Sequence, residues 1–489
     1  MAGWIVRPEP RSRSTMQSPQ EIDKVKHLLR RFGLGASEAE VDFYGSGGYE
    51  AAVDRLLESI NHQESVELGV EYLQNKDGQV VANPRQAQAV WYAEQLVTNR
   101  PLNYKMALFW HDHFATSAQK VSNGPTMLNQ MHLFRDKGLG YFRDLLIEVS
   151  QDPAMLYWLD NQNNVVGKPN ENFAREVMEL FTLGEGNYTE KDIQEAARAF
   201  TGMTYGFQRG QRVVLNRNQV PPPQSIYILD QKSHDTGFKT VLGNKGEWNG
   251  DDVVGILAAA PRTAAYLTEK LWKWFVSPTP EKSTVDKFAA TFRKANLHIP
   301  TLLKAIMLSD EFLAEGARRS IIKNPFDFCI PMARQLGIGA GIANAVKSAG
   351  DDEVKRRAVL GVPVLIKQST SVMGMELMYP PDVSGWPSGT DWISTSTMVE
   401  RISWGQELFI RNSRATQLRA DQIFGTGDPS AVTDRVLSVF DCRLPTDKKA
   451  GLVAAARKES GGTVTARNAN LVYGAIAKLM CSTPEFQFM

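Results

Sequence analysis

Hydrophobic positions along most of the chain recur every three or four residues, which is the spacing of one buried helix face. The segment from Val25 to Phe32 shows this pattern, and Gly33 follows it as a helix-ending residue. The same pattern predicts helices over residues 48–59, 84–98, 101–114, 142–150, 153–159, 169–184, 189–202, 251–257, 263–275, 301–308 and 324–336. The chain is therefore predicted to be mainly α, as a multi-helix globular fold.

The pattern changes between residues 205 and 250. Apolar and polar residues alternate in Arg212–Leu215 and in Ser225–Leu229, and prolines and glycines separate the two segments. This predicts a small β-rich insertion of two or three strands. The predicted organisation is a flexible leader, an N-terminal helical core with His and Glu motifs, the insertion, a C-terminal helical part of the core and a small helical tail. These parts cover residues 1–20, 21–204, 205–250, 251–409 and 410–489.

Composition narrows the class of protein. The chain has 489 residues, and 55 Lys and Arg balance 54 Asp and Glu, which argues against a nucleic-acid-binding protein. The sequence has no run of about 18 apolar residues, so no membrane span is expected. The leader is polar and shows no signal, which predicts a soluble cytoplasmic protein, or a periplasmic or secreted one if a signal has been removed.

The segment Trp110–Phe114 places His111 and His113 on either side of an aspartate. Neutral imidazole binds divalent transition metals through either nitrogen, so this pattern is typical of metal ligation. Helical residues two apart point about 200° away from each other, so both imidazoles reach one ion only if the segment leaves the helix. The alternative is one buried, hydrogen-bonded histidine and one solvated histidine.

The predicted helix over residues 169–184 carries Glu176 and Glu179 on one face, one turn apart. Such a pair can bind one cation or divide the roles of general acid and general base. Arg175 lies beside them and could orient one carboxylate or bind an anionic substrate. The alternative is a solvated acidic face of an amphipathic helix.

The β-rich insertion contains His234, Asp235 and Lys239 around a glycine. A histidine beside an aspartate on a glycine-containing loop suits a position that faces a substrate. The alternative is a turn in which Asp235 bonds to nearby backbone and His234 is exposed.

Two tryptophans, Trp386 and Trp392, lie on a loop rich in Gly and Pro. Exposed tryptophans on such loops can stack against sugars or aromatic rings, whereas buried ones fill the interior of an ordered loop. The sequence leaves both possibilities open.

Seven longer phrases stand out along the chain: Leu28–Gly35, Trp110–Ser117, Pro169–Gly184, Tyr188–Gly202, His234–Lys239, Lys270–Val276 and Pro380–Arg401. Together they resemble a bacterial family called domain of unknown function 1800, in the expected order over roughly residues 24 to 410. The resemblance implies no settled activity. It implies that members are often exported, and that their genes often neighbour a second family with a sulfatase-like or phosphatase-like fold, a possible partner.

We hypothesise from these residues a metal-dependent hydrolase with a site between the helices and the insertion. Its divalent metal ligands are expected to be His111, His113 and Glu176. The expected catalytic residues are Glu176, Glu179, His234 and Asp235, and the residues expected to contact a small-molecule or polysaccharide substrate are Arg175, Lys239, Trp386 and Trp392. Two alternatives stay open: a metal-free glycoside-cleaving enzyme with paired carboxylates, and a non-enzymatic scaffold or accessory subunit.

Overall fold

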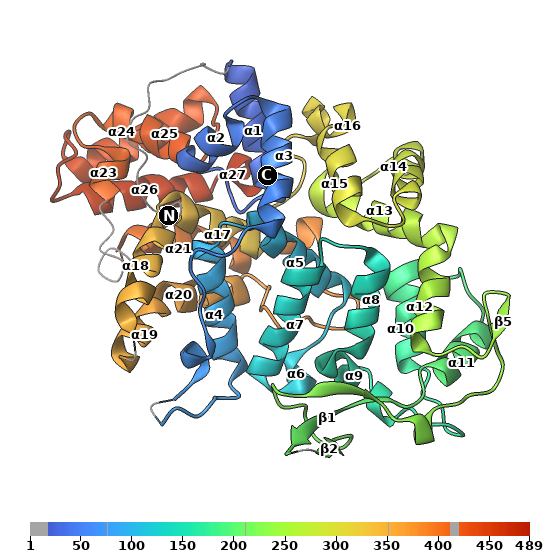
Figure 1. The fold of residues 1–489 in the computed structure, drawn as a ribbon. Coiled ribbons are helices and arrows are strands. Elements are labelled where there is room, and N and C mark those ends of the chain that lie inside the picture. Colours follow the sequence, from blue (N-terminus) through green and yellow to red (C-terminus); the bar gives the residue numbers. More distant parts are fainter. Residues whose placement is uncertain (1–17, 76, 211, 351, 411–419) are drawn as a thin grey trace.

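A computed structural model describes residues 18–75, 77–210, 212–350, 352–410 and 420–489 of the chain. Helices dominate it, and its strands are few and short, which confirms the prediction of a mainly α fold with a small β insertion (Figure 1). The N-terminal helices are α1 Pro19–Phe32, α2 Glu38–Gly45, α3 Tyr49–Glu58, α4 Pro84–Val97, α5 Pro101–His113, α6 Ala118–Val121, α7 Gly124–Lys137, α8 Phe142–Gln151, α9 Pro153–Trp158, α10 Asn172–Met178 and α11 Glu190–Ala199.

The second half of the chain is helical after the insertion. Its helices are α12 Gly250–Ala259, α13 Pro261–Phe275, α14 Lys282–Lys294, α15 Ile299–Met307, α16 Asp310–Leu313, α17 Pro325–Gln335, α18 Ile338–Ala349, α19 Glu353–Val359, α20 Gly361–Val372, α21 Thr395–Ile410, α23 Ala420–Phe424, α24 Pro429–Val439, α25 Thr446–Ser460, α26 Ala469–Cys481 and α27 Pro484–Gln487. The predicted helical tail is present in its described part; residues 411–419 of that prediction lie outside the described residues.

Helix α5 lies at the centre of the molecule, with α4, α7 and α8 around it (Figure 1). Twelve of its 13 residues are buried, and only Asp112 keeps partial exposure. Because α5 is buried on nearly every side, it forms the axis of the core. Its polar end, residues 111–113, is consequently enclosed by other segments.

The insertion contains five strands among the described residues, more than the two or three predicted. Strands β1 Met203–Arg209, β2 Arg212–Leu215 and β3 Ile226–Leu229 form an antiparallel sheet in the order β2-β1-β3. Strands β4 Lys239–Val241 and β5 Asn244–Gly246 form a separate hairpin. The sequence pattern missed β4 and β5 because three residues are too few to show alternation. It missed β1 because its first half is continuously buried.

The N-terminal leader was predicted over residues 1–20, and residues 1–17 of it lie outside the described residues. The end of that prediction is wrong by two residues. Ser18 caps α1 by accepting the N–H of Glu21, and Pro19 takes the first helical position, where its missing N–H costs nothing.

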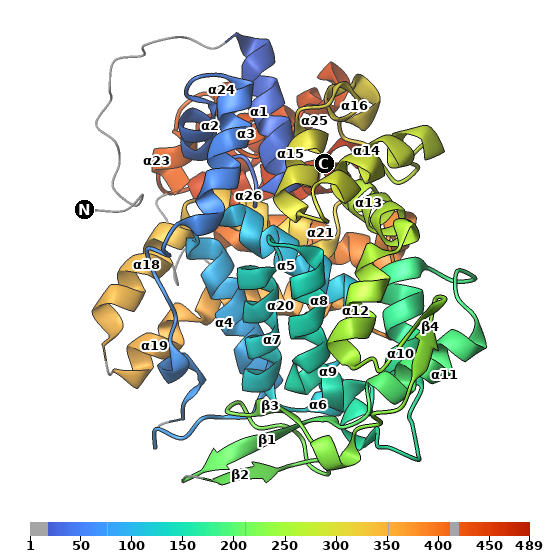
Figure 2. The ribbon, with the colours of Figure 1, turned by 45° about the vertical axis from the view of Figure 1, so that its right-hand side comes forward.

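The first helix packs beside the tail, so segments far apart in sequence meet at one end of the molecule (Figures 1 and 2). Arg30 of α1 pairs with Asp441, which directly follows α24. The end of the chain runs back against residues 321–323, where Lys323 donates its N–H to Gln487 and Met489 donates to Ile321.

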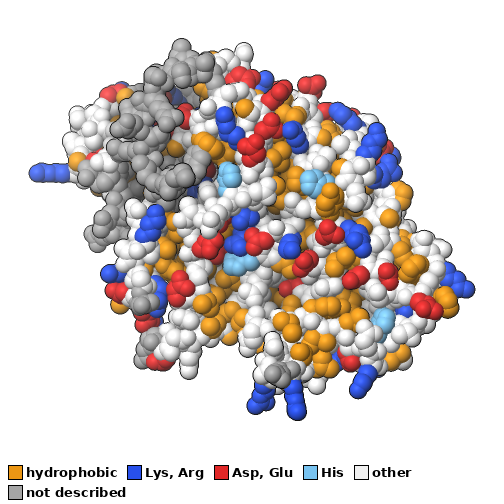
Figure 3. Space-filling view, viewed as in Figure 1, with side chains coloured by type: hydrophobic (Ala, Val, Ile, Leu, Met, Phe, Trp, Pro, Cys, Tyr) orange, Lys and Arg blue, Asp and Glu red, His pale blue; other side chains and the backbone are white. Residues whose placement is uncertain are grey.

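Charges of both signs are interspersed on the face shown in Figure 3, without a continuous basic field. Among the residues that the structure describes, no helix is long and apolar enough to span a bilayer.

Candidate functional site

The histidines of the Trp110–Phe114 segment lie on helix α5, so they point to different sides and contact different segments. The backbone N–H of Met378 donates to Nε2 of His111 across 3.0 Å, and Nε2 of His113 donates to the carbonyl of Phe181 across 3.1 Å. Burial lowers the pKa of His111 to about 3 and holds the pKa of His113 well below its usual range. Both imidazoles are therefore neutral, and the bond in which His111 accepts the Met378 N–H requires that form.

Asp112 completes this junction from the same helix end. Its carboxylate accepts the N–H of Trp386 across 2.8 Å. Burial raises the pKa of Asp112 to about 6, and the nearby Lys270 of α13 opposes that rise. The loop comes so close that a Cβ on Gly385, which has a φ of +94°, would lie 2.4 Å from Oδ1 of Asp112. We call residues 111–113 the α5 junction, because each side chain holds a separate segment in place.

The predicted metal ligands do not form a ready coordination group. Within the described ranges, no cluster of three or more His, Cys, Asp and Glu side chains is placed to hold a metal ion. Nε2 of both His111 and His113 is already bonded to backbone, and Nδ1 of each is buried without a partner. The neutral His111 accepts at Nε2 and so carries its proton on Nδ1, whereas His113 donates from Nε2 and so keeps a lone pair on Nδ1. Of these two described histidines, only His113 therefore has a nitrogen lone pair left for a ligand.

The helix predicted over residues 169–184 begins at Asn172 in the structure and changes its winding halfway. Helix α10 ends at Met178 and continues as a π-helix over Glu179–Leu183, before Gly184 ends it with a φ of +78°. Three side chains bond to carbonyls of the widened turns: the Tyr266 hydroxyl to Leu180, His113 to Phe181 and Arg262 to Leu183. A π-helical turn is rare and is frequently found at functional sites.

Glu176 and Glu179 occupy this α-to-π transition and differ in their contacts. No hydrogen bond or ion pair links Glu176 to another described residue. Burial, and after it the neighbouring carboxylate of Glu179, raises the pKa of Glu176. Glu179, in contrast, accepts a short hydrogen bond from the hydroxyl of Tyr188. The Glu176 carboxyl group thus has no hydrogen bond to a described residue, whereas the Glu179 carboxyl group is oriented by Tyr188.

Arg175 lies on the same helix and is engaged by acidic neighbours. It makes two hydrogen bonds of 2.9 Å to Glu190 and one of 3.3 Å to Glu171. This arrangement attaches α10 to the start of α11, which Figure 2 shows beside it. Arg175 can bind a substrate anion only by giving up these pairs.

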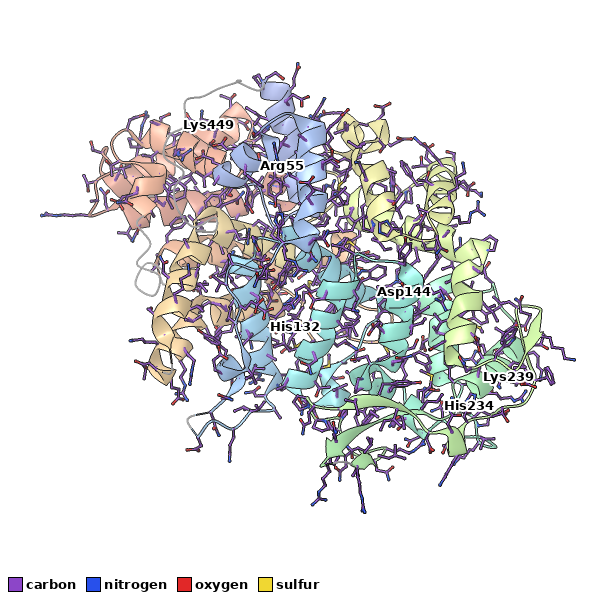
Figure 4. The ribbon with its side chains drawn as sticks, in the orientation of Figure 1. Arg55, His132, Asp144, His234, Lys239 and Lys449 are labelled. Carbon is purple, nitrogen blue, oxygen red and sulfur yellow. The ribbon has the colours of Figure 1, made fainter. Side chains whose placement is uncertain are left out.

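The predicted site residues of the insertion bond to their own surroundings (Figure 4). Nδ1 of His234 donates to the Thr201 carbonyl across 2.9 Å, and Arg198 binds Asp235 at 2.9 and 3.2 Å. Asp235 also accepts the N–H of Gly237, as in the turn that the sequence left as an alternative, but His234 is partly buried and not exposed as that alternative expected. Lys239 is 1% exposed and donates to the carbonyls of Asp235 and Gly237.

The two loop tryptophans are buried. Trp386 is 8% exposed and meets the His111 ring edge-on at 5.1 Å between centroids, and Trp392 is 5% exposed. Their burial favours the packing role over the role of a sugar platform.

The structure brings together part of the predicted set and adds residues that the sequence reasoning missed. His113 contacts the π-helix that contains Glu179, through the carbonyl of Phe181, while His234 and Asp235 of the insertion bond to the end of α11. Arg262, Tyr266 and Lys270 of α13 were missed, although their spacing of four residues places them on one helix face. That spacing was the available signal.

The larger of the described cavities lies away from this region. It has a volume of about 290 Å³ and lies among the short helix Val70–Leu73, α4, α19 and α20. Figure 1 shows α19 and α10 at opposite sides of the molecule. This cavity is therefore separate from the carboxylate pair.

Comparison with known proteins gives one match. The model of a family described as "Protein of unknown function (DUF1800)" matches residues 27–488, which includes the helical tail. No curated protein and no solved structure matches the chain.

Proposed function

The chain belongs to the DUF1800 family, as its sequence phrases predicted, and we propose that it is a hydrolase with Glu176 and Glu179 as its acid–base pair. The observation that carries this proposal is the state of Glu176. It is half-buried, its pKa is raised, and it has no bonding partner among the described residues. Such a carboxyl group keeps a proton nearer to neutral pH and is free to give it to a leaving group.

Glu179 suits the complementary role. The Tyr188 hydroxyl orients its carboxylate, which can activate a water molecule or attack the substrate directly. Residues three apart on a helix have Cβ atoms about 5–6 Å apart. Both carboxyl groups can therefore reach the same bound substrate. Two carboxyl groups suffice for glycoside cleavage, so the proposed substrate is a glycoside or polysaccharide, with Glu176 protonating the departing oxygen.

The metal-dependent form of this hydrolase stays a prediction. In that form a divalent ion, bound through Glu176 and a histidine, supplies the activated water. The contacts of His111 and His113 favour the metal-free form, because Nε2 of each is bonded to backbone and, of the two rings, only His113 keeps a lone pair, on Nδ1.

The test is an assay of the purified full chain on chromogenic glycosides, esters and phosphoesters. Glu176→Gln should lower turnover of the accepted class by about 10²–10⁴-fold, the usual loss for a general acid. Glu171→Gln, in the preceding turn, is the matched control and should stay near wild type. Turnover should also fall as pH rises through the raised pKa of Glu176. Equal activity of both variants, or no turnover by the wild-type chain, would contradict the proposal.

A chelator separates the two forms of the proposal. Activity that survives chelation supports the paired-carboxylate mechanism. Activity that chelation removes and an added divalent ion restores supports the metal-dependent one, with His111→Ala and His113→Ala identifying the ligand.

A scaffold or accessory subunit is the second candidate. It is favoured by the α5 junction, whose three polar side chains are all bonded to the chain's own backbone. The partner implied by the sequence resemblance is a phosphatase-like protein. Co-purification with such a partner, and cellular function that is undiminished in a Glu176→Gln, His111→Ala double variant, would support this candidate over the enzyme.

A further inference from the structure

A second cavity lies between α1, α17 and the end of the chain, at the end of the molecule where α1 meets the tail. Its volume is about 30 Å³, and its charged lining residues are Arg30, Arg319, Lys323, Asp327 and Asp441. A space of this size holds a few water-sized atoms, so it suits a small ion rather than a drug-sized molecule.

The carboxylates at this cavity are already shared among cations. Asp441 pairs with Arg30 and lies 3.5 Å from Arg319 and 3.7 Å from Lys26. Asp327 is bound by the buried ammonium of Lys105.

Three further cations nearby have no carboxylate partner among the described residues. The Lys323 ammonium lies 3.7 Å from the centre of the Phe486 ring. Arg401 bonds to the Lys323 carbonyl and the Gln487 amide. Arg31 is fully buried, and its Nε and Nη1 have no hydrogen-bond partner.

Positive charge therefore exceeds negative charge in a largely buried region of a chain whose net charge is only +1. Burial, and after it the charge of Arg319, lowers the pKa of Lys323 to about 7, and burial lowers the pKa of Arg31 to about 9. Buried charges are usually paired, because an unpaired one costs free energy. A bound anion would neutralise this excess of buried positive charge.

We propose that this cavity binds a small oxyanion of the size of phosphate, through Lys323, Arg319 and Arg30. Guanidinium and ammonium groups are the side chains that recognise phosphate oxygens, with arginine giving paired bonds and lysine a point charge. The site is independent of the proposed hydrolase, because it shares no residue with the carboxylate pair.

Calorimetric titration of the full chain with inorganic phosphate, at constant ionic strength in chloride, tests the site. We expect saturable binding to one site. Lys323→Met keeps the aliphatic stem over Phe486 but removes the charge, and should weaken binding by at least about tenfold, the effect of losing one charge-assisted hydrogen bond. Lys282→Met, at an exposed lysine of α14, is the control and should bind phosphate like wild type.

Several results would overturn the proposal. These are the absence of saturable phosphate binding by the wild-type chain, or equal affinity in Lys323→Met and wild type. Should Lys323→Met fail to fold, Arg319→Gln takes its place with the same expected loss. A phenyl phosphate titration separates two sources of the group: binding comparable to that of inorganic phosphate indicates a phosphate ester ligand, and much weaker binding indicates the free ion.

Discussion

The α5 junction and the α10 face are both rich in ionisable side chains, yet they use them differently. At the junction, His111, Asp112 and His113 each bond to the backbone of another segment. On α10, Glu176 bonds to no described residue although it is half-buried. The difference shows that histidines close together in the sequence can have a purely structural role. A half-buried carboxyl group without a hydrogen bond is the better indicator of a catalytic role.

Among the substitutions that test this comparison, Gly385→Ala is expected to change the free energy of unfolding most. The new methyl group would overlap Asp112, and the positive φ disfavours any residue with a Cβ. We expect a loss of about 3 kcal/mol in the free energy of unfolding, measured in urea. Gly389→Ala is the control, since its φ is also positive but its Cβ meets open space. Equal losses in both variants would show that Asp112 does not hold the loop.

His111→Phe should have the next largest effect. The ring keeps the packing against Trp386, but the buried N–H of Met378 loses its acceptor. An unsatisfied buried donor costs about 1–3 kcal/mol, so a loss of about 2 kcal/mol is expected in the same measurement. A neutral result would remove the structural role that the comparison assigns to this histidine.

Asp112→Asn should change stability in a pH-dependent way. Because the pKa of Asp112 is raised in the folded chain to about 6, the folded state binds more protons than the unfolded state. The wild-type chain therefore loses stability as pH rises from about 4 to about 6. The asparagine still accepts the Trp386 N–H and removes this loss. We expect the variant to be more stable than wild type at pH 7 by about 1–2 kcal/mol, with the difference vanishing near pH 4.

Glu176→Gln should have the smallest effect on stability. The glutamate makes no bond that the amide would lose, so the change in the free energy of unfolding should stay within about 0.5 kcal/mol. The sign should favour the variant at neutral pH, because the raised pKa means that ionised Glu176 slightly destabilises the fold. A loss of stability as large as that of His111→Phe would show that Glu176 has a structural role, which would contradict the comparison.

Local features of the fold followed from the sequence. The helix predicted over residues 189–202 is present as α11, and Thr189 and Asp192 form a capping box at its start. The opposite directions of His111 and His113 followed from helical spacing alone.

Features that depend on distant partners did not follow from the sequence. The π-helix has the same apolar pattern as an α-helix, and its carbonyls find partners on α5 and α13. The bond between His113 and Phe181 joins residues 68 positions apart, and periodicity carries no information at that range. The sequence also could not predict that Glu176 has no hydrogen bond to a described residue, because this depends on which residues the tertiary fold places beside it.

The pairing of Arg30 with Asp441 has a consequence for how the protein is made. The two residues are 411 positions apart, so α1 leaves the ribosome long before its partner exists. At about 5–20 residues per second, that wait is on the order of tens of seconds. During it, the charged side of α1 must stay in water or find a temporary partner. Closure of the tail over the first helix therefore cannot begin until residue 441 has been made.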